Sequence, residues 1–408
     1  MLSYNQFNGK LPSSICNLTR VKYFFLSNTN LVETIPMCFG NMSKSLDFLH
    51  LNGNRFRGPI PSTFSKECSL RSINFNGNKL EGKLPESLAN CSSLEGLDIG
   101  NNRIHGNFPY WMEAFPQLRV LVLRSNKFDG NMSPSSLTNH PFPMLQVLDI
   151  SGNAFVGSVP ERYINNFNIM INTTKDNIIG NSIENFFRIL LEMRVTLKGQ
   201  HQLLERLLEG FTLIDFSSNR FSGSIPCSIG NLQSLRYLNL SHNNFIGNIP
   251  SSLANISTLE SLDLSSNSMD GVIPSELTGL TFLTKLNLSM NDLVGEVPRS
   301  NQFSTFENDS YVENFGLCGV PLTRKCKEET RPIEKEDDED EDEFIDGFGW
   351  KSVVMGYGCG SIVGIGIGCR VPRYGKPRWL VEFFFGVEYY KKKKKRRQSK
   401  ATPTQRRR

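Results

Sequence analysis

The chain has 408 residues and contains 33 glycines, 20 prolines and 39 asparagines, too many residues that disfavour helix interiors for a helical bundle. Its formal net charge of +5 is uneven: residues 331–346 hold ten acids and two bases, net −8, and residues 370–408 hold fifteen bases and two acids, net +13. The first 330 residues are therefore close to neutral, which argues against a globally basic nucleic-acid-binding protein.

A short motif recurs through residues 1–326 at a nearly constant spacing. Its full form reads L-x-x-L-x-L-S-x-N-x-F-x-G-x-I-P, and the chain holds eleven copies. The motif asparagines are 24 residues apart at positions 54, 78, 102 and 126, and again at 219, 243, 267 and 291. Alternating leucines predict a short strand with one buried face, and a single coil cannot bury that face alone. The repeat therefore predicts a solenoid of stacked coils.

This repeat resembles the unit of plant extracellular leucine-rich-repeat proteins, and in particular of kinase-lacking, disease-resistance-type receptor-like proteins. Segments such as Gly82-Lys83-Leu84-Pro85 and Gly271-Val272-Ile273-Pro274 supply the G-x-I/L-P arm of that unit. The resemblance implies an α/β solenoid, a leucine-rich-repeat superhelix, with N-terminal repeats in residues 1–160 and four more in residues 211–298. Met1 falls inside a repeat with no cap or signal peptide before it, so we expect an N-terminally truncated chain.

The array is interrupted in residues 161–210, because Asn153 and Asn219 are 66 residues apart instead of 24. The insertion contains Arg194-Val195-Thr196-Leu197-Lys198-Gly199 and a helix-like run at residues 203–208. A flexible linker and a functional loop are both possible, and the apolar content favours the ordered loop. The insertion resembles the island domain of the same family, which implies ligand or co-receptor contact through Arg194, Lys198 and Gly199.

Residues that alternate with the strand leucines point outward on the expected concave face. Tyrosine and arginine on a rigid surface are typical binding hot spots, although a solvated strand position explains any one of them alone. For the face as a whole we expect ligand binding. The candidate residues are His50, Arg124, Asp149, Asp215, Tyr237, Asp263 and Lys285.

The repeat ends after Pro298, and residues 299–330 resemble the C-terminal cap of the family. The resemblance implies a disulfide between Cys318 and Cys326. The other cysteines of the repeat region show no metal-ligand spacing, and the sequence leaves open whether they are buried thiols or further bridges. Cys68 and Cys91 occupy similar repeat positions, so they are one possible pair.

An acidic segment, residues 331–349, precedes an expected transmembrane helix at residues 350–370. The uncharged stretch Ser352–Cys369 would be about 27 Å long as a helix, just enough to cross a bilayer, and Arg370 interrupts it early. Glycines recur every four residues on one face, which would let a second helix approach closely. These are Gly356, Gly360, Gly364 and Gly368.

The basic residues 371–408 predict a cytoplasmic tail, since positive charge gathers on the cytoplasmic side. The run at residues 391–397 is also compatible with nucleic-acid binding, but beside a membrane span we interpret it as a contact to anionic lipid. We therefore expect a single-pass plasma-membrane protein with its N-terminus outside.

Nine N-x-S/T sequons indicate an extracellular, glycosylated surface. Two of them, Asn239 and Asn287, lie in expected strands of the concave face, where a glycan would obstruct binding. The sequons we expect to be glycosylated are Asn17, Asn41, Asn90, Asn131, Asn172, Asn255 and Asn308.

No motif for catalysis, metal binding or a cofactor stands out. The five histidines have no metal-spaced partners, and neither a nucleophile-elbow nor a kinase motif is present. We therefore expect neither an enzyme nor a cofactor. The resemblance implies a receptor that binds an extracellular peptide or pathogen-derived ligand and signals in plant defence. Its partners would be an adaptor receptor kinase and a co-receptor, bound through the membrane helix and the last repeats, and not nucleic acid.

Three alternatives remain. The chain could be a developmental receptor-like protein, because defence and developmental receptors share this architecture. It could be a soluble inhibitor of a pathogen wall-degrading enzyme, or a truncated copy without function. The sequence does not identify the ligand.

Overall fold

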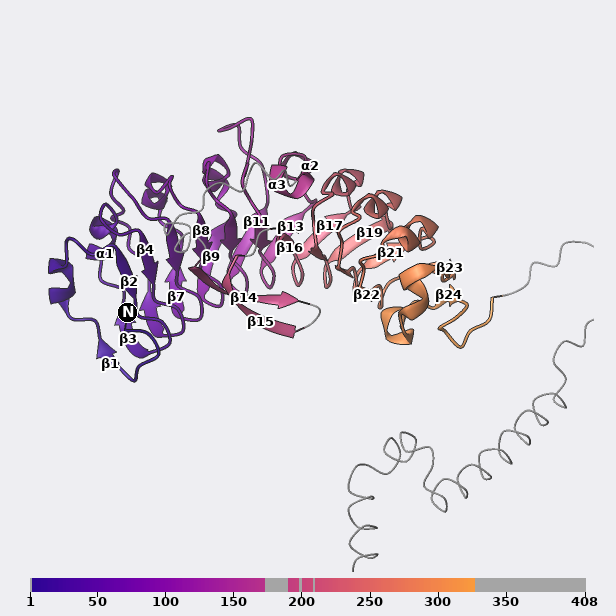
Figure 1. Cartoon of the computed structure of the whole chain (residues 1–408), viewed down its shortest axis with the longest axis horizontal. Coiled ribbons are helices and arrows are strands. Elements are labelled where there is room, and N and C mark those ends of the chain that lie inside the picture. Colours follow the sequence, from indigo (N-terminus) through magenta and orange to yellow (C-terminus); the bar gives the residue numbers. More distant parts are fainter. Residues whose placement is uncertain (1, 173–189, 198–199, 208–209, 327–408) are drawn as a thin grey trace, which may run out of the picture. The chain divides into compact units, whose positions relative to one another are not determined.

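The computed structural model describes residues 2–172, 190–197, 200–207 and 210–326, all of which belong to one compact unit, Met1–Glu328. There the chain forms successive coils, most of which add one strand to an inner sheet and one to an outer sheet (Figure 1). The expected acidic segment, transmembrane helix and basic tail lie outside the described residues. Within the described ranges, no helix has both the length and the apolar character needed to cross a bilayer.

The inner sheet is a 10-stranded parallel sheet whose strands come from equivalent positions of successive coils. Its middle residues are buried leucine, isoleucine or phenylalanine, as the alternation of the repeat requires. The strands are β2 (Tyr23–Phe25), β4 (Phe48–His50), β6 (Ser72–Asn74), β8 (Gly96–Asp98), β10 (Val120–Val122), β12 (Val147–Asp149), β16 (Leu213–Asp215), β18 (Tyr237–Asn239), β20 (Ser261–Asp263) and β22 (Lys285–Asn287).

The outer sheet is also parallel and 10-stranded, and each strand follows the motif asparagine or its equivalent. In most of these strands one buried apolar side chain lies between two exposed residues. The strands are β1 (Asn8–Lys10), β3 (Asn30–Thr34), β5 (Arg55–Gly58), β7 (Lys79–Gly82), β9 (Arg103–Asn107), β11 (Lys127–Asn131), β13 (Ala154–Gly157), β17 (Arg220–Gly223), β19 (Asn244–Asn248) and β21 (Ser268–Asp270).

Short helical turns close the coils on the side away from the inner sheet (Figure 1). Most are 3-10 turns that follow a proline, because an arm of five residues closes more readily with i→i+3 bonds than with a full α-helical turn. They are η1 (Ser13–Asn17), α1 (Cys38–Met42), η2 (Glu86–Asn90), η3 (Tyr110–Ala114), α2 (Glu161–Ile164), α3 (Asn168–Ile171), η5 (Cys227–Asn231), η6 (Ser251–Asn255) and η7 (Ser275–Gly279), and then η8 (Asn301–Thr305) and η9 (Asn308–Ser310) near the C-terminal end. The expected α/β solenoid is thus, over the described residues, mainly a β and 3-10 solenoid.

The motif asparagines form an asparagine ladder that links neighbouring coils. In Asn243, Nδ2 donates to the carbonyl of Phe216 in the preceding coil (3.0 Å) and to that of Leu240 in its own coil (3.1 Å). Its Oδ1 accepts from the backbone N–H of Phe221 at 3.0 Å. One buried amide therefore satisfies these three backbone groups, besides a contact of Nδ2 with the Ser241 carbonyl at 3.1 Å, which explains why the repeat requires asparagine here. Asn219, Asn267 and Asn291 make the same three contacts.

A phenylalanine column stacks inside the outer sheet from coil to coil. Ring centroids are 6.1 Å apart for Phe128 and Phe155, 6.2 Å for Phe155 and Phe221, and 6.4 Å for Phe221 and Phe245. All four side chains are buried. Phe155 and Phe221 are neighbours in the column although 66 residues separate them in the sequence, so the core is continuous across the insertion.

The insertion leaves the array without disturbing either sheet. β12 pairs directly with β16, and β13 with β17. Residue 161, the expected start of the insertion, lies in the return arm of the coil, which contains α2 and α3. In this arm the Met170 carbonyl accepts a hydrogen bond from the Ser234 N–H of the next coil at 2.8 Å.

Two antiparallel strands, β14 (Leu190–Leu197) and β15 (Gln200–Arg206), form a hairpin in the insertion. The prediction of a helix at residues 203–208 is therefore wrong for residues 203–206, which belong to β15. Backbone pairing with β14 supplies hydrogen bonds that a local pattern of leucines and charges cannot reveal.

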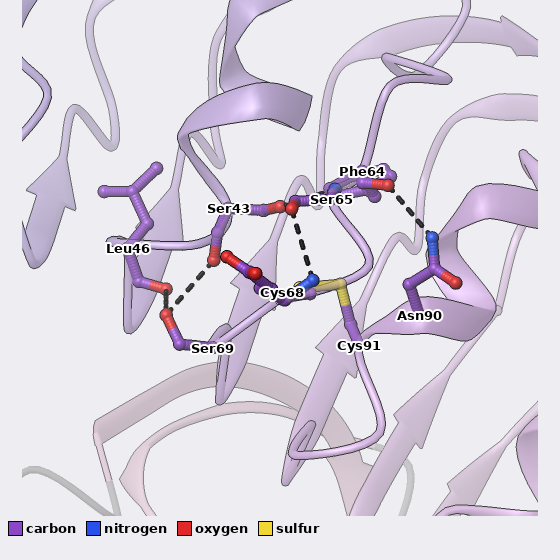
Figure 2. Close-up of a disulfide and its surroundings, with 9 residues drawn as sticks. Ser43, Leu46, Phe64, Ser65, Cys68, Ser69, Asn90 and Cys91 are labelled. Atoms are coloured by element: carbon purple, nitrogen blue, oxygen red, sulfur yellow. Dashed lines mark hydrogen bonds between the residues drawn. A yellow bond between two sulfur atoms is a disulfide. The ribbon is translucent and has the colours of Figure 1, made fainter.

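Disulfides connect the helical arms of neighbouring coils. Cys16 pairs with Cys38, and Cys68 with Cys91, whose Cα atoms are 4.8 Å apart. Figure 2 shows the second pair beside two further links between coils: Asn90 Nδ2 donates to the Phe64 carbonyl at 3.0 Å, and Ser69 Oγ donates to the Ser43 carbonyl at 3.1 Å. The sequence had left these pairings open.

The C-terminal end is covered by η8 and η9 and by a small parallel sheet of β23 (Val294–Glu296) and β24 (Gly316–Cys318). Phe303, Tyr311 and Leu317 are buried there, which shields the last coil from water. Cys318 and Cys326 form a disulfide within this cap.

Candidate ligand-binding surface

The inner sheet is the candidate binding surface, and the structure divides it into two parts. From β4 to β16 every strand residue is buried, including those that alternate with the core leucines. From β18 to β22 the alternating residues reach the solvent, with Ser261 as the exception. We call the second part the open inner surface and define it by Tyr237, Asn239, Asp263, Lys285 and Asn287.

Residues of the insertion and of the segment that follows it lie over the first part. Leu207 and Phe211 pack in one apolar cluster with Val120, Val122 and Val147 of the inner sheet. β14 lies against β6, and Figure 1 shows the β14–β15 hairpin beside the inner strands. The three valines stand where an uncovered inner sheet would expose apolar side chains to water, so this packing removes apolar surface from solvent.

Four of the seven expected concave residues are consequently wrong as exposed contacts. The exposed fractions are 2% for His50, 7% for Arg124, 1% for Asp149 and 3% for Asp215. The repeat pattern places them correctly on the inner sheet, but it contains no information about an insertion folding back over that sheet.

His50 is a neutral structural histidine. Burial lowers its pKa to about 3, because the charged imidazolium loses its hydration in the interior. Its Nε2 is 2.9 Å from Ser72 Oγ, and its ring contacts Phe25 edge-on with centroids 4.9 Å apart. These contacts position the ring within the protein, away from any ligand in solvent.

A row of buried carboxyl groups lies under the covered part. Asp149 and Asp215 are direct partners on β12 and β16, and Asp98 lies on β8. Burial raises the pKa of Asp98 to about 6 and, together with the nearby Asp149, that of Asp215 to about 7. Burial also raises the pKa of Asp149, against the opposing effect of Arg124, whose Nη1 is 3.8 Å from an Asp149 oxygen. One guanidinium therefore faces three carboxyl groups.

These carboxyl groups lower the free energy of unfolding as pH rises, and together they outweigh His50, whose lowered pKa acts in the opposite direction below about pH 6.5. The folded chain keeps protons on these carboxyl groups at pH values where an unfolded aspartate has lost them, so unfolding releases protons between about pH 4 and pH 7. We expect a decrease of about 2 kcal/mol between pH 5 and pH 8, measured by urea denaturation. Asp215→Asn should reduce this pH dependence, whereas the exposed control Asp270→Asn should leave it unchanged. A profile that Asp215→Asn leaves unchanged would contradict the assignment.

Tyr237 connects the open inner surface to the end of the insertion. Its hydroxyl donates to Glu260 Oε2 at 2.8 Å, and its ring packs on Phe211 with centroids 5.4 Å apart. Arg236 bonds Glu260 Oε1 through Nη1 at 2.6 Å and the carbonyl of Gly210 through Nε at 2.8 Å. Burial and the Glu260 carboxylate raise the pKa of Tyr237 to about 12, so the hydroxyl remains a donor at neutral pH.

The polar residues of the open inner surface are held in place by their own loops. Asp263 Oδ1 accepts from the backbone N–H (3.0 Å) and the hydroxyl (2.6 Å) of Ser265. Asn239 and Asn287 use their Oδ1 in the same way with Ser241 and Ser289. The other carboxylate oxygen of Asp263 accepts from Asn287 Nδ2 at 3.4 Å. These contacts hold the polar groups in a fixed orientation, which lowers the entropy cost of binding a ligand.

The remaining expected site residues are placed as follows. Arg194 lies in β14, whereas Lys198, Gly199 and the four membrane-helix glycines lie outside the described residues. The sequons are exposed except for the half-buried Asn90. Asn17, Asn41, Asn90, Asn255 and Asn308 lie on helical turns, Asn131 ends β11, and Asn172 follows α3.

Arg236, Glu260 and Phe211 did not stand out in the sequence. Arg236 and Glu260 each immediately precede an inner strand in neighbouring coils, and 24 residues separate them. Opposite charges one repeat period apart could have predicted this ion pair from the sequence. Phe211 has no comparable signal, because its contact with Tyr237 depends on where the insertion re-enters the array.

Comparison with known proteins agrees with this geometry. A family model described as leucine rich repeat matches residues 68–128, and a second with the same description matches residues 45–66, 211–232, 234–256 and 258–280. The chain is 50% identical over 239 residues to "Receptor-like protein 9DC3" of Solanum pimpinellifolium, covering 57% of this chain and 27% of that protein. It is 40% identical over 387 residues to "Receptor-like protein 32" of Arabidopsis thaliana, covering 94% of this chain and 44% of that protein. The chain thus spans less than half the length of these relatives.

Solved structures with the same fold include the leucine-rich-repeat ectodomain of the Arabidopsis thaliana receptor kinase GASSHO1/SCHENGEN3 in complex with CASPARIAN STRIP INTEGRITY FACTOR 2. The match has a TM-score of 0.62 at 29% identity and covers 80% of this chain and 36% of that one. A second is the Arabidopsis receptor kinase HAESA in complex with the peptide hormone IDA and the co-receptor SERK1, with a TM-score of 0.57 at 26% identity, covering 79% and 51% of the two chains.

Proposed function

The chain belongs to the plant leucine-rich-repeat receptor-like proteins, and from this premise we propose that it binds an extracellular peptide on the open inner surface and signals through a partner receptor kinase in plant defence. It acts by binding and not by catalysis. It sits in the plasma membrane, anchored by residues 350–370, with the repeats outside. Its extracellular surface is glycosylated at the exposed sequons.

The open inner surface is the observation that carries this proposal. It offers an aromatic anchor in Tyr237, a cation in Lys285 and an acid in Asp263 on three neighbouring strands. Strands of one sheet lie about 4.8 Å apart, so an extended peptide crossing them meets side chains of different chemistry in turn. Tyrosine supplies large contact area at low entropy cost, which makes it the expected hot spot.

The partner kinase is proposed to bind through the glycine face of residues 350–370 and through the last repeats. One of the solved structures is a receptor kinase in complex with a peptide hormone and a co-receptor, and another is a receptor kinase in complex with CASPARIAN STRIP INTEGRITY FACTOR 2.

The experiment is capture of peptides by the full chain, purified in detergent, from a peptide pool of plant extracellular fluid, with mass-spectrometric identification. Lys285→Ala and Tyr237→Ala should each lower recovery of the enriched peptides about tenfold or more, as hot-spot truncation does. The matched control, Lys44→Ala with Lys66→Ala, removes exposed lysines elsewhere and should change nothing. Equal recovery by all variants would refute peptide binding on this surface.

A second arm tests the kinase partner with the same preparation. Replacing the four glycines Gly356, Gly360, Gly364 and Gly368 with leucine should abolish co-purification of a receptor kinase, because leucine prevents close helix approach. Peptide capture should remain. Unchanged co-purification would exclude the proposed glycine face as the contact.

A further inference from the structure

A row of cations crosses the outer sheet in four consecutive coils. Each cation directly follows the ladder asparagine of its coil and is the first residue of an outer strand. The four are Arg55 in β5, Lys79 in β7, Arg103 in β9 and Lys127 in β11. All four are exposed, whereas the next residue in each strand is a buried apolar side chain. The pleat therefore directs all four cations outward on the same face. We call these four residues the basic stripe.

The basic stripe is a departure from the repeat and not a consequence of it. The same position holds Ala154, Asn244, Ser268 and Asp292 in later coils, and only Arg220 restores a cation. Folding requires nothing of the outward residue at this position, since the buried neighbour supplies the packing. Four cations in succession therefore form a local feature of the surface.

Within the described ranges, no ion pair neutralises the charges of the stripe. Arg57, beside it on β5, forms a two-pronged pair with Glu33, with both Nη2–Oε distances 2.7 Å. By contrast, the four stripe residues make no ion pair with any residue in the described ranges. A shallow hollow of about 590 Å³ lies at this place, lined by Val32, Glu33, Arg55, Arg57, Lys79, Glu81 and Arg103.

The outer sheet also remains accessible where other faces are covered. The sequons Asn17, Asn41, Asn90 and Asn255 all lie on the helical turns, so their glycans would cover that side. The insertion and the segment that follows it lie over part of the inner sheet, against β6, β10 and β12. Among the expected sequons only Asn131, at the end of β11, lies on the outer sheet.

We propose that the basic stripe binds a linear polymer of uronic acids, with the sugar carboxylates on the cations. Adjacent strands are about 4.8 Å apart, so four of them extend over at least about 14 Å, too far for one small anion to span. A uronate polymer carries one carboxylate on each successive ring, and guanidinium groups bind carboxylates through two parallel hydrogen bonds. The three disulfides of the described residues indicate an oxidising, extracellular setting, so the ligand is expected to be an extracellular polymer.

The acids near the stripe restrict which polyanion fits. Glu81 and Asp129 lie on β7 and β11, and Glu33 lies on the neighbouring strand β3, so the net charge of the surface is modest. Polymers with denser charge, such as nucleic acids, would place phosphates against these carboxylates. A polymer with one charge for each residue can align its carboxylates with the cations and avoid the acids.

The test measures binding of de-esterified oligogalacturonate to the full chain by biolayer interferometry. A shared background replaces Lys391 to Arg397 with glutamine and carries Asn131→Gln, which removes the basic tail run and the neighbouring sequon. The stripe variant adds Lys79→Gln, Arg103→Gln and Lys127→Gln. The matched control instead adds Arg20→Gln, Lys44→Gln and Lys66→Gln, three exposed cations elsewhere.

The stripe variant should bind about tenfold more weakly than the background, as expected when three exposed charge contacts are lost. The control should bind like the background, and added salt should weaken both. Circular dichroism should show unchanged folding in all three proteins. Equal affinity of stripe variant and control, or equal binding of the fully methyl-esterified polymer, would overturn the proposal. Tighter binding of polyglutamate would overturn it in favour of an acidic protein ligand.

Discussion

Replacing Phe221 with alanine is expected to lower the free energy of unfolding by about 3–5 kcal/mol. The side chain is fully buried, and its ring lies between Phe155 and Phe245 in the phenylalanine column. Alanine would remove the buried apolar area of the ring and leave a cavity where the coil before the insertion meets the coil after it. The neighbouring coils are rigid, so they cannot collapse to fill that cavity. Urea denaturation followed by circular dichroism measures the loss.

The matched control is Phe282→Ala. Phe282 has an exposed fraction of 64%, so its truncation should change the free energy of unfolding by less than about 0.5 kcal/mol. If both variants lost the same stability, the phenylalanine column would not be what joins the two halves of the array.

Replacing Asn243 with alanine should cost about 3 kcal/mol, because it leaves buried backbone groups without partners. The substitution removes the acceptor of the Phe221 N–H and the donor to the carbonyls of Phe216 and Leu240. These groups lie in two different coils, so the loss affects both stacking and the turn within the coil. The same denaturation experiment measures it.

Asn244→Ala is the control for this second variant. Asn244 is the next residue, exposed at the start of β19, so alanine there removes an amide that faces solvent. Its effect should stay within about 0.5 kcal/mol. Comparable losses at positions 243 and 244 would mean that the asparagine ladder does not stabilise the coils.

The repeat pattern predicted the array of inner strands because each position in it performs one local task. The leucines fill the core, the motif asparagine bonds backbone, and the proline begins the return arm. Each task involves only adjacent coils, so the period alone reveals it. The second sheet was not predicted, since its strands are short and their outward residues vary, for example from Arg55 to Ser268. Their order depends on pairing between coils and not on a pattern within one coil.

The binding surface was less predictable, and the reason is long-range contact. The pattern for outward residues fits the exposed Lys285 and four buried residues equally well. The buried ones are His50, Arg124, Asp149 and Asp215. What separates them is whether another segment covers them, and Leu207 and Phe211 pack on Val120 and Val147 from at least 60 residues away in the sequence. No local signal encodes that packing. The cysteine pairs remained open for a similar reason, because similar repeat positions do not show whether two arms come close enough to bond.

The direct pairing of β13 with β17 has a consequence for how such a protein can change over generations. The coils before and after the insertion complete each other's hydrogen bonds and core, so the array does not depend on the loop that leaves it there. Substitutions, lengthening or shortening in that loop can alter what the inner sheet shows to a ligand while the framework stays intact. The cover of the inner sheet and the framework of the array are thus encoded in separable stretches of the gene, and selection can act on one without damaging the other.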